Sequence, residues 1–165
     1  MIQFKALFWP VLGALALALL AAVPVAAAGD SIVVIVNSAN PVENLSLADL
    51  KKIFLSDRSK WETGKSVAPV MPGPGAAERV AFLKVVCGMT DADFSKYFVT
   101  AAFTGKDVTP PKEVSSARDV KSVVAGSPGA IGFVKASDFS SGESGLKAVK
   151  VSGAGADEAG YKLKL

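Results

Sequence analysis

The stretch from Met71 to Arg79, MPGPGAAER, has the composition of a backbone anion site. Glycine lets a backbone approach a ligand closely, and the free N–H groups and dipole at the start of a helix both favour negative charge. The chemistry indicated is the binding of a small oxyanion. Arg79 is the only nearby cation, and the backbone donors would come from Gly73, Gly75, Ala76 and Ala77.

The same stretch also contains features that oppose an anion. Pro72 and Pro74 have no N–H to donate. Glu78 falls in the first helical turn, where its carboxylate would interact with the helix dipole and repel an incoming anion. The alternative interpretation is therefore a loop that only begins a helix, and the sequence favours it over a strong anion site.

The residues most often used in catalysis are largely missing from the chain. It contains no histidine, so it can form no Ser-His-Asp triad, no Cys-His pair and no imidazole metal site. Cys87 is the single cysteine and lies in the apolar segment FLKVVCGM, so we expect a buried, inert thiol. Asp91 and Asp93 resemble a metal pair, but their place after Thr90 is better explained as first-turn helix charge. We expect no enzyme, no cofactor and no metal site.

Alternating strand and helix patterns position these residues. Apolar β-branched runs predict strands over 31–36, 67–71 and 146–151 and within SPGAIGFV, 127–134. Helices are predicted after the capping residues Ser46 and Thr90, over 76–86 ended by Gly88, and after Ser115 or Ser116. The fold class is α/β, with a small mixed sheet flanked by helices. Predicted core residues are Val80, Leu83, Val86 or Cys87, Phe94, Tyr97, Phe98 and Phe103, with Trp61 covering the edge of the domain.

The N-terminus predicts export. Residues 1–28 combine Lys5, a long apolar run and Ala26-Ala27-Ala28, the pattern of a cleaved signal peptide; the alternative is an uncleaved membrane anchor. Residues 29–165 are then one domain of 137 residues with a net charge of +2. Its basic residues are scattered, which argues against a nucleic-acid partner.

The order of the segments VVIVN, LSLADLKKIFLSDRSKW, VAPV and PGAIGFV, over roughly residues 33–135, resembles phosphate-type periplasmic solute-binding proteins. The resemblance implies one lobe of a type II periplasmic-binding-protein fold, since full members close two lobes on an oxyanion. It also implies an Arg and a Ser-Gly-Thr helix start as ligands. Those positions fall here on Met71 or Pro72 and on Ala76, Ala77 and Glu78, so these ligands are absent.

Two functional hypotheses follow from this resemblance. The first is an exported, periplasmic solute-binding-like domain with degraded phosphate ligands, a non-catalytic binding or interaction module whose partner is a membrane transporter or sensor protein. The second is an oxyanion-binding protein, phosphate being the model ligand, that completes its site by dimerising or with a partner. If binding is retained, the ligand residues expected are Asn37, Ser38, Gly73, Gly75, Ala76, Ala77 and Arg79.

Overall fold

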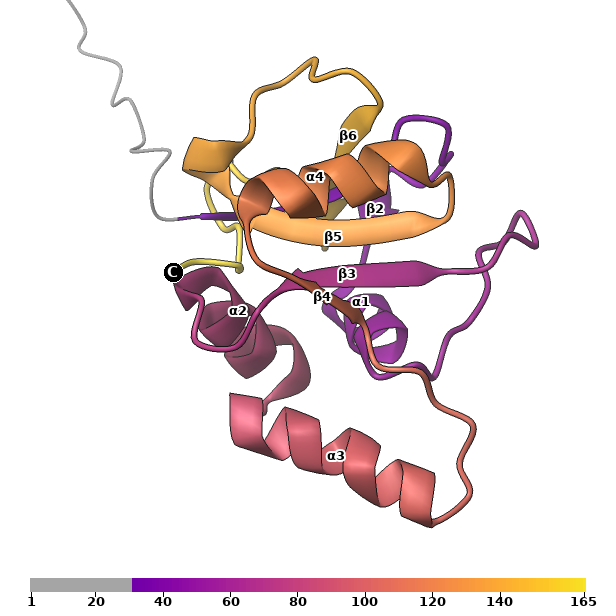
Figure 1. The fold of residues 1–165 in the computed structure, drawn as a ribbon. Coiled ribbons are helices and arrows are strands. Elements are labelled where there is room, and N and C mark those ends of the chain that lie inside the picture. Colours follow the sequence, from indigo (N-terminus) through magenta and orange to yellow (C-terminus); the bar gives the residue numbers. More distant parts are fainter. Residues whose placement is uncertain (1–30) are drawn as a thin grey trace, which may run out of the picture.

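A computed structural model describes residues 31–165, and the predicted signal peptide, residues 1–28, lies outside the described part. The described chain forms a six-stranded mixed sheet of order β2-β6-β1-β5-β3-β4 (Figure 1). The strands are β1 (Ile32–Asn37), β2 (Asn44–Leu45), β3 (Ala68–Pro72), β4 (Lys112–Val114), β5 (Ala130–Lys135) and β6 (Leu146–Val151). The helices are α1 (Leu47–Phe54), α2 (Ala77–Phe82), α3 (Asp91–Phe103) and α4 (Ala117–Gly126), with a π-helical turn (Leu83–Cys87) after α2 and a 3-10 turn (Ala136–Asp138) after β5.

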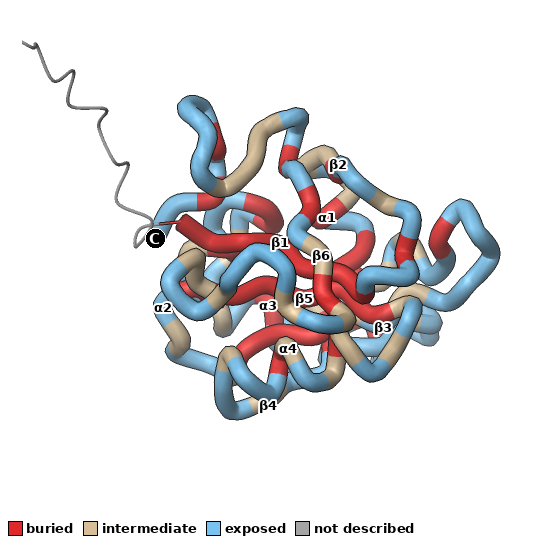
Figure 2. The backbone as a smooth tube through the Cα atoms, turned by 90° about the horizontal axis from the view of Figure 1, so that it is seen from above, coloured by how far each residue is buried: buried red, intermediate tan, exposed pale blue. Residues whose placement is uncertain are grey.

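β1 is one of the two central strands, and every one of its residues is buried, as its continuous apolar sequence predicts (Figure 2). It runs antiparallel to β5 on one side and to β6 on the other. β3 runs parallel to both β5 and β4. The sheet is therefore mixed, as the sequence predicts, and β1 points in the opposite direction to β3.

Helices cover both faces of the sheet. On one face, α4 packs Val120 and Val124 against the odd-numbered residues of β1. On the other face, α1 and α2 pack against the even-numbered residues, around the contacting rings of Phe54, Phe82 and Phe133. This division follows from the period of two along β1, because alternate side chains point to opposite faces.

The predicted helix starts are confirmed in detail. The Ser46 hydroxyl accepts a hydrogen bond from the Asp49 N–H at 3.0 Å, and the Asp49 carboxylate accepts one from the Ser46 N–H at 3.2 Å. Thr90 and Asp93 form the same reciprocal pair at the start of α3. These bonds to Ser46 and Thr90 lower the pKa of the Asp49 and Asp93 carboxyls.

Several predicted elements are corrected by the structure. β4 lies after Pro110-Pro111, where the sequence predicts no strand, because a three-residue strand carries too short a pattern to be recognised. Val80 and Phe103 are exposed by 48% and 89%, so their assignment to the core is wrong. Trp61 is buried, as predicted, and its indole N–H donates to the Gly129 carbonyl at 2.9 Å.

The C-terminal segment closes the sheet beside β1. The Ile32 N–H donates to the Leu163 carbonyl at 2.9 Å, and the Tyr161 hydroxyl donates to the Ile32 carbonyl at 2.6 Å. Burial raises the pKa of that hydroxyl, so it stays protonated as a donor. Among residues 31–165, no helix has the length and apolar character that crossing a bilayer requires.

Gly132 in β5 packs closely against α4 and β3, and a substitution there can test this packing. A Cβ at this position would lie 2.7 Å from Cγ1 of Val120 and 3.2 Å from the Val70 carbonyl oxygen. We expect Gly132→Ala to lower the free energy of unfolding by about 1–3 kcal/mol through overpacking. Gly126→Ala is the control, because nothing lies within 4 Å of its Cβ. Urea unfolding measures both, and equal stability of the two variants would contradict this packing.

Cys87 provides a second test of the core. Its thiol is buried, and burial raises its pKa to about 11. We expect no reaction with a thiol reagent in the native protein at neutral pH. The thiol ionises at lower pH in the unfolded chain than in the folded chain, so its contribution to stability is present below pH 9 and is lost between about pH 9 and 11. Rapid labelling of the folded protein at neutral pH would contradict the burial.

Candidate functional site

The candidate site lies where the parallel strands β3, β4 and β5 end (Figure 1). Ligands of open α/β sheets bind at the carboxyl ends of such strands. The loop after β3 leads directly into α2 here, so the glycine-containing stretch recognised in the sequence occupies this end of the sheet.

Most of the backbone donors located in this loop are already used. The Gly73 N–H donates to the Val114 carbonyl at 2.9 Å, and the Ala76 N–H makes a long bond of 3.4 Å to the Gly73 carbonyl. Gly75 has a φ of 84°, a conformation that favours glycine, and its N–H donates to Oδ2 of Asp91 at 3.3 Å. Ala77 is exposed at the first position of α2. The Gly75 N–H is thus occupied by a side-chain carboxylate.

Arg79 is enclosed rather than offered to a ligand, and its side chain is only 1% exposed. Its Nε pairs with Oδ1 of Asp91. Its Nη1 donates to Oε1 of Glu113 at 2.6 Å and to the Pro72 carbonyl at 3.0 Å. A buried guanidinium must be neutralised by partners of this kind, since an unpaired charge there would be very costly.

The charge around the loop disfavours an incoming anion. Glu78 is 7% exposed, and its Oε2 lies 3.7 Å from Nζ of Lys135, the last residue of β5. Three carboxylates and two cations therefore share this end of the sheet, a net charge of −1. They are Glu78, Arg79, Asp91, Glu113 and Lys135.

Asp91 contacts both the loop and the buried cation. One oxygen accepts the Gly75 N–H and the other faces the Arg79 guanidinium. The sequence predicts only the helix-dipole role of this residue at the start of α3 and misses its contact with the loop, and it misses Glu113 entirely. The one sequence signal for these contacts was Arg79, because a buried arginine needs acidic partners. Those partners, Asp91 and Glu113, lie 12 and 34 residues further along the chain.

Asn37 and Ser38 lie at the opposite end of the sheet from Gly73. At one end of the sheet, Val36 of β1 pairs with Ile131 of β5, which in turn pairs with Pro69 near the start of β3. At the other end, Ile32 of β1 pairs with Lys135 of β5, near the end of β3. Four strand residues, about 13 Å at 3.3 Å per residue, separate the two ends. The structure therefore does not bring the two groups of predicted ligand residues together, because β1 runs antiparallel to β5.

The side chain of Asn37 has a structural role in its own place. Its Nδ2 donates to the carbonyls of Val124 and Ala125 at 3.0 and 2.8 Å, near the end of α4, and its Oδ1 accepts the Ala39 N–H at 2.9 Å. The Ser38 N–H donates to the Gly145 carbonyl at 3.0 Å. Each Asn37 group is thus already bonded, which leaves the exposed Ser38 side chain as the accessible one of the pair.

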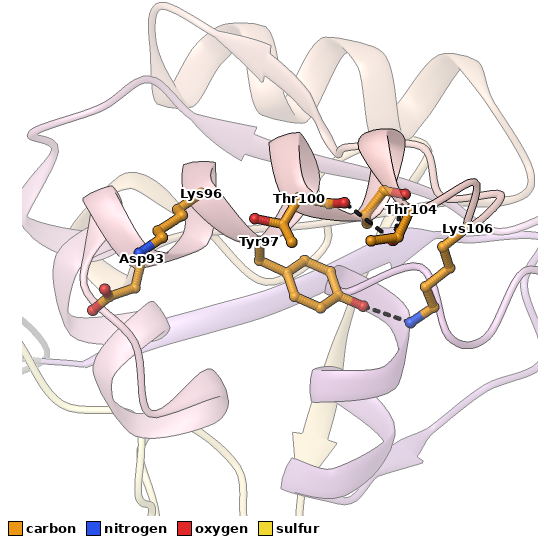
Figure 3. A pocket seen from close by; sticks show the side chains of 7 residues that line it. Asp93, Lys96, Tyr97, Thr100, Thr104 and Lys106 are labelled. Carbon is orange, nitrogen blue, oxygen red and sulfur yellow. Dashed lines mark hydrogen bonds between the residues drawn. The ribbon is translucent and has the colours of Figure 1, made fainter.

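Two hollows lie away from all the predicted ligand residues. A groove of about 810 Å³ crosses the ends of β1 and β6 and is bordered by Phe139 and the segment 155–160. A shallower hollow of about 370 Å³ runs along α3, where Tyr97 and Lys106 are hydrogen-bonded at 2.8 Å (Figure 3). Among residues 31–165, no three His, Cys, Asp or Glu side chains are grouped to hold a metal ion.

Comparison with known proteins identifies the fold. The sequence matches no protein-family model and no curated protein. Solved structures do match, among them a phosphate ABC transporter substrate-binding protein of Clostridium perfringens with bound phosphate (25% identity, TM-score 0.60, 77% of this chain and 47% of that one). A second is an ABC-type phosphate transport receptor of Vibrio cholerae (21% identity, TM-score 0.61, 77% of this chain and 48% of that one). A third is PstS of Borrelia burgdorferi (14% identity, TM-score 0.62, 82% of this chain and 54% of that one).

The fold is therefore that of the periplasmic phosphate-binding receptors, as the resemblance in the sequence implies. The chain spans about half the length of the structures that it matches. Its mixed sheet flanked by helices has the architecture expected of one lobe.

The Asp91 contact can be tested by removing the carboxylate. We expect Asp91→Ala to lower the free energy of unfolding by about 2 kcal/mol, because it removes bonds to a buried charged group. If the carboxylate stands in the place of an anion, added acetate or phosphate should raise the melting temperature of this variant and leave the unmodified protein unchanged.

Asp93→Ala is the matched control for that experiment. Asp93 lies in the same helical turn but bonds only to Thr90, so its removal should create no anion-dependent stabilisation. An equal response of both variants to added anions would show that Asp91 has no special place in the loop.

Proposed function

We propose that this chain is an exported, non-catalytic binding or interaction domain related to the phosphate-transport receptors, in which capture of free phosphate has been replaced by an internal contact. One observation carries the proposal: the guanidinium of Arg79 is buried and paired with Asp91 and Glu113, and Asp91 also takes the Gly75 N–H. The fold is retained, while the donors and charge that would hold an anion serve the protein's own carboxylates.

The partner of such a domain would be a protein of the transport system, either a membrane transporter component or a sensor. The support is the fold shared with ABC-type phosphate receptors. Export rests on the signal-peptide pattern of residues 1–28. The lack of a histidine in the sequence, and so of Ser-His-Asp and Cys-His arrangements, supports a non-catalytic role.

Calorimetry with the purified exported protein tests the lost-ligand part of the proposal. We expect no heat of binding for phosphate or sulfate at micromolar concentrations, because a free anion would have to displace Asp91 and enter a site of net negative charge. Micromolar or tighter phosphate binding by the monomer would contradict it. The Asp91→Ala variant serves as the comparison, since it removes the competing carboxylate.

The second candidate function is oxyanion binding that a second subunit or a partner completes. The observation in its favour is the bound phosphate in the Clostridium perfringens structure, of which this chain covers 47%. In this case phosphate should raise the melting temperature and also shift the protein to a dimer in size-exclusion chromatography. The absence of both effects with every oxyanion tested would exclude it.

A further inference from the structure

α3 forms an outer layer of the domain. Figure 1 shows α4, the sheet, the layer that contains α1 and α2, and then α3 on the far side of that layer. The helix buries only Phe94, Phe98 and Ala101, and its other residues are partly or fully exposed. A helix of this length is marginal by itself in water, so its stability depends on these few contacts. No hydrogen bond of the sheet depends on α3.

A glycine with positive φ lies on each side of α3. Gly88, with a φ of 68°, ends the π-helical turn before the helix, and Gly105, with a φ of 74°, follows the helix. Nothing lies within 4 Å of the place that a Cβ would take at either glycine. Hinge motions are absorbed at a few element-terminal positions of this kind. Gly88 and Gly105 are therefore suited to act as hinges.

The attachments of α3 to the rest of the described chain run through side chains. Within residues 31–165, the hydrogen bonds that join the helix to other elements involve Asp91, which contacts Gly75 and Arg79, and Tyr97, which donates to the Leu55 carbonyl at 3.2 Å. The backbone groups of α3 bond only within the helix and its caps. Breaking these side-chain contacts would thus release the whole helix.

The contacts at the two ends of α3 differ in strength. Lys106, just after the helix, pairs with Asp57 at 2.8 Å, but these side chains are 49% and 42% exposed, so the pair contributes little. At the other end, the Arg79 side chain is 1% exposed, and its Cζ also lies 5.8 Å from the centre of the Phe94 ring. The Asp91–Arg79 contact is therefore the stronger attachment.

Arg79 keeps other partners when Asp91 leaves it. Its Nη1 still donates to Glu113 and to the Pro72 carbonyl, neither of which belongs to α3. Release of the helix also lets water reach the guanidinium. The charge is thus never left without a partner, which would be the main cost of such a movement.

We propose that α3 is a hinged lid, which opens as one unit about the two flanking glycines while the sheet and the other helices stay folded. The Asp91–Arg79 contact is its latch. Opening frees the Gly75 N–H and exposes the two buried phenylalanines of α3 in a single movement. Units of this kind open at a lower free energy than the whole domain. The lid needs neither an anion nor a partner, so it is independent of the proposed function.

Native-state hydrogen exchange at residue resolution measures the opening. We expect the amides from Phe94 to Ala101 to share one opening free energy, below that of β1 and β5. Protection that rises gradually from the ends of α3 to its middle would indicate fraying. Protection equal to that of β1 would indicate opening only by global unfolding. Either result would overturn the proposal.

Gly132→Ala separates opening of the lid from global unfolding. The substitution strains the contacts of β5 with α4 and β3, and none of the atoms that its Cβ would meet belongs to α3. It should therefore accelerate exchange in β1 and β5 and leave exchange in α3 unchanged. Acceleration of α3 in step with β1 would show that the helix opens only with the whole domain.

The latch is tested by variants at the two ends of the helix. Asp91→Ala should accelerate exchange in α3 by about tenfold or more, because it removes bonds to a charged group. Lys106→Ala is the matched control and should accelerate it by less than about threefold, since it removes only an exposed ion pair. Equal effects of the two variants would overturn the assignment of the latch.

Discussion

Arg79 carries its charge inside the lobe, and three separate parts of the chain are arranged to neutralise it. The guanidinium contacts the end of β3 through Pro72, the start of α3 through Asp91 and β4 through Glu113. These contacts hold the loop after β3, the outlying helix and the edge strand in one arrangement. Losing either carboxylate would leave a buried charge short of a partner, which is why the cluster constrains this whole end of the sheet.

The same cluster supports the proposal that a receptor-like fold is kept here while its ligand chemistry has changed. A helix-start anion site presents free backbone N–H groups to an anion from solution. Here an aspartate on α3 accepts the loop N–H and pairs with the cation. This carboxylate links the loop to α3, and the same contact leaves the Gly75 N–H unavailable to a free anion.

Local sequence patterns were sufficient for most of the fold. The continuous apolar run of β1, the capping pairs at Ser46 and Thr90, and the glycine after the π-helical turn all act over a few residues, and all are found as predicted. Phe103 was misassigned because α3 also exposes apolar residues, Val99 and Phe103, so its periodicity does not reveal which face is inside. β4 was missed because its pairing with β3 depends on residues about 40 positions away.

The sequence by itself determined that this chain is α/β, that it lacks histidine-based chemistry, and that a glycine-containing loop begins a helix after a strand. The tertiary structure alone decided what that loop contacts. Asn37 and Gly73 lie at opposite ends because strand direction is a property of the whole sheet. Arg79 pairs with Asp91 and Glu113 because a buried charge needs partners, and these can come from any distance along the chain. Residue spacing in the sequence therefore does not predict them.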